Sequence, residues 1–307
     1  MTRLAVIWLA VGALGSGDAL AQGRGACTAA NGGAAPFGPE MPLADTGRVY
    51  ASVLTPDERE FYFFRKVGAR RSEDYRIYRA ARVGAGWGPV EQVDLGGDFS
   101  DLYPSFSPDG RRMVFSSYRP VAGDTSKHPN AHLWMTERRG SGWSTPVLLS
   151  ASRLGHYHSG LRQDVHGHVS FTRTTPDWSG AESLLLRWTG TTYGAAAEPV
   201  VDPATVYWRQ ALGDTVHVWH TMASPDGVTL VQVSQVSGAN KRRGPAVYLV
   251  SRQTASGWTP LGRAGGGLGE GAPNFLWFSR DGCWVHYTKD YSSFWKVPVS
   301  TVTAGIR

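Results

Sequence analysis

The sequence has few cysteines, few charged residues and no long apolar segment. Only two of its 307 residues are cysteine, which excludes a small domain held together by several disulfides. Charged residues make up 18% and aromatic residues 11%, so the chain resembles neither a disordered protein nor a coiled coil. Beyond the N-terminus no apolar run approaches the 18 or so residues that a transmembrane helix needs. We therefore expect a folded domain without a membrane-spanning segment.

Residues 1–21 have the pattern of a cleaved secretory signal. Arg3 precedes an apolar run from Leu4 to Leu14, and an Ala-Leu-Ala sequence ends at residue 21. This pattern predicts a periplasmic or secreted protein. Residues 22–36 are then expected to form a flexible tail and residues 37–307 the folded domain.

The two cysteines lie near opposite ends of the expected mature chain. In an oxidising compartment Cys27 and Cys283 could pair, or each could remain an independent thiol, because the sequence does not reveal the distance between their Cα atoms. The formal net charge of +6 is spread over small clusters, and no nucleic-acid-binding motif accompanies it. We therefore expect no nucleic-acid partner, and we expect a monomer.

A repeat of about 55 residues organises the chain. Its clearest copy, residues 103–117, reads Tyr-Pro-Ser-Phe-Ser-Pro-Asp-Gly, then Arg-Arg, then Met-Val-Phe-Ser-Ser, which is typical of a strand, a tight turn and a second strand. Matching turns centre on residues 57, 109, 166, 226 and 281. Each is followed by a β-rich run, a third apolar run and a fourth run with an aromatic residue and proline. Each repeat therefore predicts four strands, the last at an outer edge where proline is tolerated.

The last repeat lacks its fourth run, and a matching piece, Phe37-Gly38-Pro39, precedes the first. Such an offset favours a closed ring in which the N-terminal strand completes the last sheet and leaves no open edge. We predict an all-β fold, a single β-propeller of five four-stranded blades, with six as the alternative count. Residues 201–215 are expected to form a long surface loop. The Asp-Gly pairs are assigned to turn formation rather than to a ring of catalytic carboxylates.

The Tyr-Pro-Ser-Phe-Ser-Pro-Asp-Gly unit, followed by Met-Val-Phe-Ser-Ser and Leu-Trp, resembles the bacterial TolB-like β-propeller repeat, which occurs in exported proteins. The resemblance covers most of residues 48–298, although only the second and fourth turns match it fully. It implies a propeller that acts outside the cytoplasm and does not specify a reaction.

Binding sites of propellers usually lie where the innermost strands begin, since residues from all blades converge there at one mouth of the tunnel. The candidate ligand-binding residues are Tyr50, Asp101, Tyr103, His158, Trp219, His220 and Asn274, bordered by Arg162, Gln163 and Trp208. We predict an exported binding protein that recognises a peptide, protein or glycan of the cell envelope or exterior at this mouth, with no cofactor.

The alternative is a secreted metal-dependent polysaccharide lyase or hydrolase. His156 and His158 alternate along one strand and would point to the same face, so that with His220 they could offer three nitrogen ligands to a divalent metal. Tyr50 or Tyr103 would then act as acid or base. The spacing is not a closed zinc signature, and no nucleophile elbow or phosphate-binding loop accompanies it.

Overall fold

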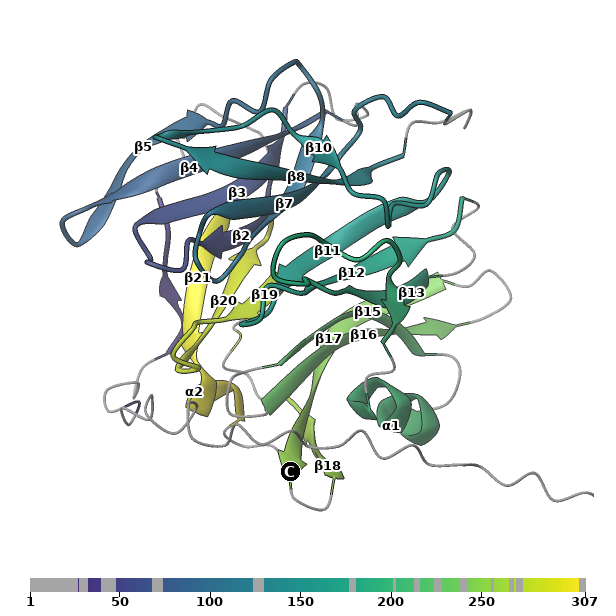
Figure 1. Ribbon diagram of the computed structural model, residues 1–307. Helices are drawn as coiled ribbons and strands as arrows, with labels where there is room; N and C mark the ends of the chain where they lie inside the picture. The colour runs from purple at the N-terminus through teal and green to yellow at the C-terminus, as the bar shows by residue number, and fades with distance from the viewer. Residues whose placement is uncertain are drawn as a thin grey trace, which may run out of the picture.

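The computed structural model describes residues 27, 33–39, 48–67, 74–123, 130–176, 181–200, 203–212, 216–223, 228–237, 242–254, 257–264, 268 and 273–303. The predicted signal, residues 1–21, lies outside these ranges. The described residues form five antiparallel sheets arranged as a ring (Figure 1). The all-β propeller fold predicted from the repeat is therefore confirmed, and the sheets match the repeats one to one.

Each sheet runs outward from an inner strand, as in a propeller blade. Blade 1 contains β2 (Val49–Leu54), β3 (Glu60–Lys66), β4 (Tyr75–Val83) and β5 (Gly86–Gln92). Blade 2 contains β6 (Asp101–Phe106), β7 (Arg112–Ser117), β8 (His132–Arg139) and β10 (Val147–Leu148), and the short β9 (Gly142–Trp143) also pairs with β8. Blade 3 contains β11 (Tyr157–Gln163), β12 (Val169–Thr174), β13 (Ala181–Leu186) and β14 (Glu198–Pro199).

Blade 4 contains β15 (Val216–Ala223), β16 (Val228–Ser237), β17 (Arg242–Thr254) and β18 (Gly257–Arg263). Blade 5 contains β19 (Pro273–Phe278), β20 (Trp284–Lys289), β21 (Ser293–Pro298) and, as its outer strand, β1 (Ala35–Pro36). A short helix, α2 (Val299–Thr303), follows β21. Inner strands of neighbouring blades touch: β6 contacts β2 and β11, and β19 contacts β2 and β15.

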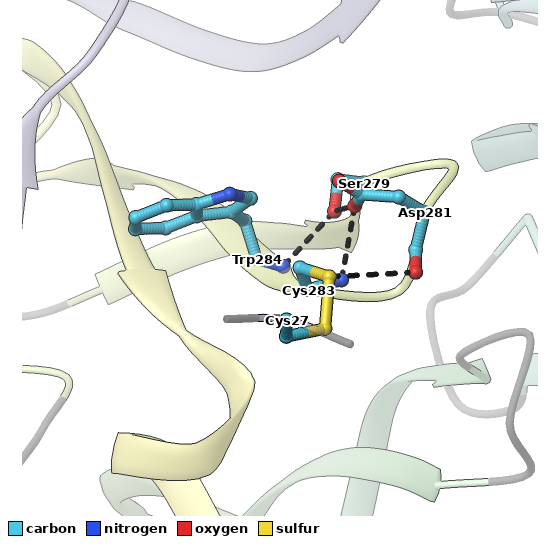
Figure 2. The surroundings of a disulfide bond; sticks show 5 residues. All are labelled: Cys27, Ser279, Asp281, Cys283 and Trp284. Carbon is cyan, nitrogen blue, oxygen red and sulfur yellow. Dashed lines mark hydrogen bonds between the residues drawn. A yellow bond between two sulfur atoms is a disulfide. The ribbon is translucent and has the colours of Figure 1, made fainter. Parts of the chain in front are cut away.

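The N-terminal strand joins blade 5, as the circular offset of the repeats predicted. Ala35 pairs with Lys296 and Pro36 with Trp295, while the Phe37 amide donates to the carbonyl of Phe294 at 2.7 Å. The strand thus begins two residues before the Phe37-Gly38-Pro39 piece, inside the segment expected to be a tail. Cys27 is joined to Cys283 by a disulfide, with 5.6 Å between the Cα atoms (Figure 2).

The strand-connecting turns use one hydrogen-bond network in three blades. In blade 2 the Ser107 hydroxyl donates to Asp109, whose Oδ1 also accepts from the amide of Arg111, and the Arg112 amide donates back to Ser107 Oγ at 2.9 Å. Thr55 with Asp57, and Ser279 with Asp281 beside the disulfide (Figure 2), repeat this arrangement. The carboxylates therefore organise turns, as expected from the Asp-Gly pattern.

Apolar side chains fill the gaps between blades. Tyr62, Phe64 and Ile77 of blade 1 pack with Met113 and Phe115 of blade 2 in one buried cluster. Because these rings bury large apolar areas, each such contact contributes on the order of a few kcal/mol and holds neighbouring inner strands in place.

The connection between blades 3 and 4 differs from the expected loop. It contains a helix, α1 (Pro203–Leu212), whose first residue is proline, a residue well suited to the first helical position. Trp208 is buried, and its indole N–H donates to Ser251 Oγ at 3.0 Å. Trp208, which the sequence placed at the border of the tunnel mouth, therefore fastens α1 to blade 4.

Candidate functional site

All five inner strands carry a β-bulge near their first residues. The register shifts lie between Val49 and Ser52 in β2, Leu102 and Ser105 in β6, Ser159 and Arg162 in β11, Val218 and His220 in β15, and Asn274 and Trp277 in β19. A bulge leaves ladder positions unpaired and re-aims the side chains that they carry. The repeated bulges therefore leave residues at about the same level of all five inner strands unpaired in their sheets.

Several of the bulged residues have left-handed backbone conformations. The φ angle is 53° at Tyr103, 54° at Phe275 and 65° at Gly160, and Tyr291 in the β20–β21 turn has a φ of 55°. Glycine adopts this conformation without penalty, whereas an aromatic residue pays about 1 kcal/mol or more. Three aromatic residues are therefore held here in conformations that their own backbone preferences disfavour.

Their rings contact one another across blades 1, 2 and 5. Tyr50 contacts Phe64, Phe275 and Tyr291 at centroid distances of 5.1, 5.8 and 5.3 Å. Tyr103 contacts Phe64 at 4.8 Å and Phe275 at 6.3 Å. Because β6 and β19 belong to blades 2 and 5, which are not neighbours, the contact between Tyr103 and Phe275 joins two separate parts of the propeller.

We call this group, completed by Tyr75, the axial aromatic cluster; its members are Tyr50, Phe64, Tyr75, Tyr103, Phe275 and Tyr291. All of them except Phe64 are only half-buried. The cluster therefore offers solvent a surface of rings and hydroxyls on a rigid frame, as binding sites commonly do.

The hydroxyl groups of the cluster favour their neutral forms. Burial raises the pKa of Tyr103 to about 12 and that of the neighbouring Tyr157 well above its usual value, although hydrogen bonding from Tyr157 and the charge of Arg162 act to lower the pKa of Tyr103. Burial also raises the pKa of Tyr50. These hydroxyls keep their protons at neutral pH and can donate as well as accept hydrogen bonds.

Cations lie beside the rings. The Arg48 guanidinium is 5.4 Å from the centroid of Tyr291, and the Lys66 ammonium is 5.8 Å from that of Tyr75. Arg162, in β11, interacts electrostatically with Tyr103. Three cationic side chains thus lie near the cluster.

Of the residues predicted at the mouth, Tyr50 and Tyr103 meet in this cluster. Asp101 instead forms a buried ion pair, with 3.0 Å between its Oδ2 and Arg119 Nη2. Burial raises the pKa of Asp101 to about 6 despite the lowering effects of Ser117 and Arg119. Asp101 therefore anchors the end of blade 2 and is not part of the cluster.

His158 is fully buried and joins blade 3 to blade 2. Its Nδ1 lies 2.9 Å from the carbonyl oxygen of Ala131, and its Nε2 accepts from the amide of Arg153 at 3.4 Å. His156 places its Nδ1 3.1 Å from the carbonyl oxygen of Leu154. Both ring nitrogens of His158 are therefore engaged by the protein. Within the described part of the chain, no group of three or more His, Cys, Asp or Glu residues is arranged to hold a metal ion.

Trp219 and His220 belong to β15, and Asn274 belongs to β19. Their side chains lie outside the described part of the structure, so their predicted roles stay predictions.

Gln163, expected at the border of the tunnel mouth, links blades 2 and 3, because its side-chain amide donates to the Ser105 carbonyl at 2.6 Å.

Tyr75 and Tyr291 were not among the residues predicted at the mouth of the tunnel, whereas Phe275 lies at a predicted inner-strand start. Phe275 lies next to the predicted Asn274, within the bulge of β19. Tyr75 begins the third strand of blade 1, and Tyr291 lies in the turn between the second and third strands of blade 5. A search confined to the starts of inner strands could not find Tyr75 or Tyr291.

A hollow lies at the turns of blades 1, 2 and 5. Its volume is about 910 Å³, and its lining includes Arg59, Arg111 and Arg280 together with Asp57 and Asp109. Here Asp57 and Asp109 are used in the turns described above. Arg280 donates to the Pro56 carbonyl at 3.1 Å. Asp57, Asp109 and Arg280 in the lining of this hollow thus stabilise the fold.

None of the helices among the described residues is long and apolar enough to cross a membrane. No protein-family model matches the sequence, and no curated protein matches it.

Solved structures similar to this chain include the periplasmic gluconolactonase PpgL of Pseudomonas aeruginosa, with 15% identity, a TM-score of 0.47, and coverage of 79% of this chain and 78% of that one. A putative TolB from Agrobacterium tumefaciens has 14% identity and a TM-score of 0.39, with 80% and 91% covered. The tricorn protease has 11% identity and a TM-score of 0.46, with 86% of this chain covered. This chain spans 26% of the tricorn protease chain. These likenesses concern the fold alone.

Proposed function

We propose that this protein is an exported, monomeric β-propeller that binds a peptide, protein or glycan at the axial aromatic cluster. The observation that carries the proposal is the left-handed backbone of Tyr103, Phe275 and Tyr291, three residues from three separate segments whose rings share one surface. Backbone strain of this kind is characteristic of functional sites, where the fold holds side chains in a preset geometry.

The chemistry of the cluster supports binding. Half-buried rings offer flat apolar faces at low cost in side-chain entropy, and protonated tyrosine hydroxyls supply donors at their rims. The bulged inner strands hold these groups before a ligand arrives, so little ordering opposes association. Export is supported by the predicted signal and by the disulfide, which is typical of oxidising compartments.

Binding of the full-length mature chain to glycan and peptide arrays tests the proposal. The informative variant is Tyr103→Gly, because glycine tolerates the left-handed conformation and the change removes only the ring. We expect at least about a tenfold loss of affinity, the size typical of a central aromatic contact. The control is Tyr207→Ala, which removes an exposed tyrosine on α1. Binding that survives Tyr103→Gly and Tyr50→Ala would contradict the proposal.

The enzymatic alternative has a separate test. Metal analysis of the purified protein should show no stoichiometric divalent ion if the protein only binds its ligand. A bound ion that is lost in both His156→Ala and His220→Ala would favour the lyase or hydrolase instead. N-terminal sequencing of the exported protein should begin at Gln22, next to the predicted cleavage site.

A further inference from the structure

Half-buried arginines of this protein generally lie against carboxylates. Arg76, Arg79, Arg112, Arg138 and Arg173 each have an aspartate or glutamate oxygen within 4.0 Å. Arg119, which is more deeply buried, pairs with Asp101. This agrees with the general cost of removing a guanidinium charge from water without a partner.

Arg162, the one arginine in the described inner strands, has no such partner. It directly follows the bulge of β11, and its Nη1 donates to the carbonyl of Leu161 at 2.8 Å. Its Nε is shielded from solvent and has no hydrogen-bond partner. No carboxylate of the described chain lies within ion-pair distance of it.

The free atoms of Arg162 have a definite geometry. Nε and Nη2 form the edge of a guanidinium that donates two parallel hydrogen bonds to a carboxylate.

The third inner strand also carries Gly160 where the first, second and fifth strands carry Tyr50, Tyr103 and Phe275, so blade 3 adds no aromatic ring at this level. Arg162 lies close enough to Tyr103 for their charges to interact.

The neighbouring charges favour an anion. Arg48 and Lys66 lie against rings of the same cluster, and with Arg162 these cations outnumber Asp290, the exposed carboxylate next to Tyr291. Burial lowers the pKa of Arg162 to about 10, which still leaves the group charged at neutral pH.

We propose that Arg162 pairs with a carboxylate of the ligand bound at the axial aromatic cluster. This inference rests on the proposed function and adds the chemical class of the ligand, a carboxylate carried by an acidic sugar or by a peptide C-terminus. The ligand's carboxylate would supply the counter-charge that the fold omits at this position, while the rings hold the rest of the ligand.

Two matched pairs of probes test the inference by ligand-observed NMR on the full-length mature protein. Glucuronate is compared with glucose, and N-acetylphenylalanine with its amide. We expect one acid to bind about tenfold more tightly than its neutral counterpart, as a charge-assisted bidentate contact allows. The pair that shows the preference identifies the source of the carboxylate.

Arg162→Gln should abolish that preference. Arg187→Gln is the matched control, because it removes the same charge from an exposed arginine of the same blade that pairs with Glu198. A lack of preference for either acid, or a preference that persists in Arg162→Gln, overturns the inference. If array ligands are lost in Tyr103→Gly but bind Arg162→Gln unchanged, the inference fails while the proposed function stands.

A purely structural role for Arg162 has a different signature. Without ligand, Arg162→Met should be as stable to urea as the parent protein or more stable, because it removes an unpaired, shielded charge. A clear loss of stability in Arg162→Met would mean that the arginine supports the fold, and would also overturn the inference.

Discussion

At the scale of single residues, two buried histidines make stability depend on pH. Burial lowers the pKa of His158 to about 4 and that of His286 to about 3, and nearby positive charge acts in the same direction on both. In the unfolded chain these histidines have a pKa of about 6.5. Between about pH 6.5 and pH 4 the unfolded chain therefore binds protons at both rings, whereas the native state keeps them neutral. The free energy of unfolding should fall as the pH is lowered through this window.

Replacement of His158 tests this dependence. In His158→Gln, we expect the loss of stability between pH 6.5 and pH 4 to shrink by about 2–3 kcal/mol, while stability at pH 7.5 falls by about 1–3 kcal/mol because the buried hydrogen bonds are remade poorly. Urea unfolding at a series of pH values measures both. His166→Gln, which removes an exposed histidine of the same blade, is the control. An unaltered profile in His158→Gln would refute the assignment.

Some residues of the candidate site could be predicted from the sequence, and others could not. Tyr50 and Tyr103 could be found from the sequence because they begin inner strands of recognisable repeats. Arg162 was placed only at the border, since nothing in the sequence tells whether an arginine has a carboxylate beside it. Asp101 seemed equally suitable, but its carboxylate is engaged by Arg119.

At the scale of elements, the repeated turn is the best-predicted feature. Its Ser or Thr and Asp residues are close in sequence, so their hydrogen bonds depend little on the rest of the fold. The bulges of the inner strands were not predicted, because a bulge follows from how a strand packs on its neighbours and has no composition of its own.

Removal of the turn carboxylate in blade 2 should destabilise the protein. Asp109 accepts from the Ser107 hydroxyl and from the Arg111 amide, and these bonds keep its pKa below the usual value although burial opposes them. We expect Asp109→Ala to lower the free energy of unfolding by about 1–2 kcal/mol. Glu137→Ala, which breaks an exposed ion pair with Arg139, should cost less than about 0.5 kcal/mol. Equal effects in urea unfolding would contradict this account.

At the scale of the whole molecule, the ring is closed by two separate contacts near the N-terminus. β1 completes blade 5, and the disulfide between Cys27 and Cys283 ties residues 256 positions apart to the same blade. A crosslink over so long a segment strongly restricts the conformations of the unfolded chain and thereby stabilises the folded protein.

Loss of the disulfide should therefore weaken the closure without changing the fold. We expect Cys27→Ser to lower the free energy of unfolding by about 2–4 kcal/mol, and reduction of the parent protein to have the same effect. Thermal unfolding with and without reductant measures the change. If the reductant lowers the melting temperature of Cys27→Ser as much as that of the parent, the effect does not come from this disulfide.

The sequence by itself determined the architecture, because turn chemistry, strand patterning and a period of about 55 residues act locally and are repeated in every blade. It also located two tyrosines of the candidate site. Only the tertiary structure decided the rest: which aromatic rings of different blades meet, which arginine lacks a carboxylate, and that the two cysteines pair. These features depend on distances between residues far apart in the chain, and packing of the blades alone sets those distances.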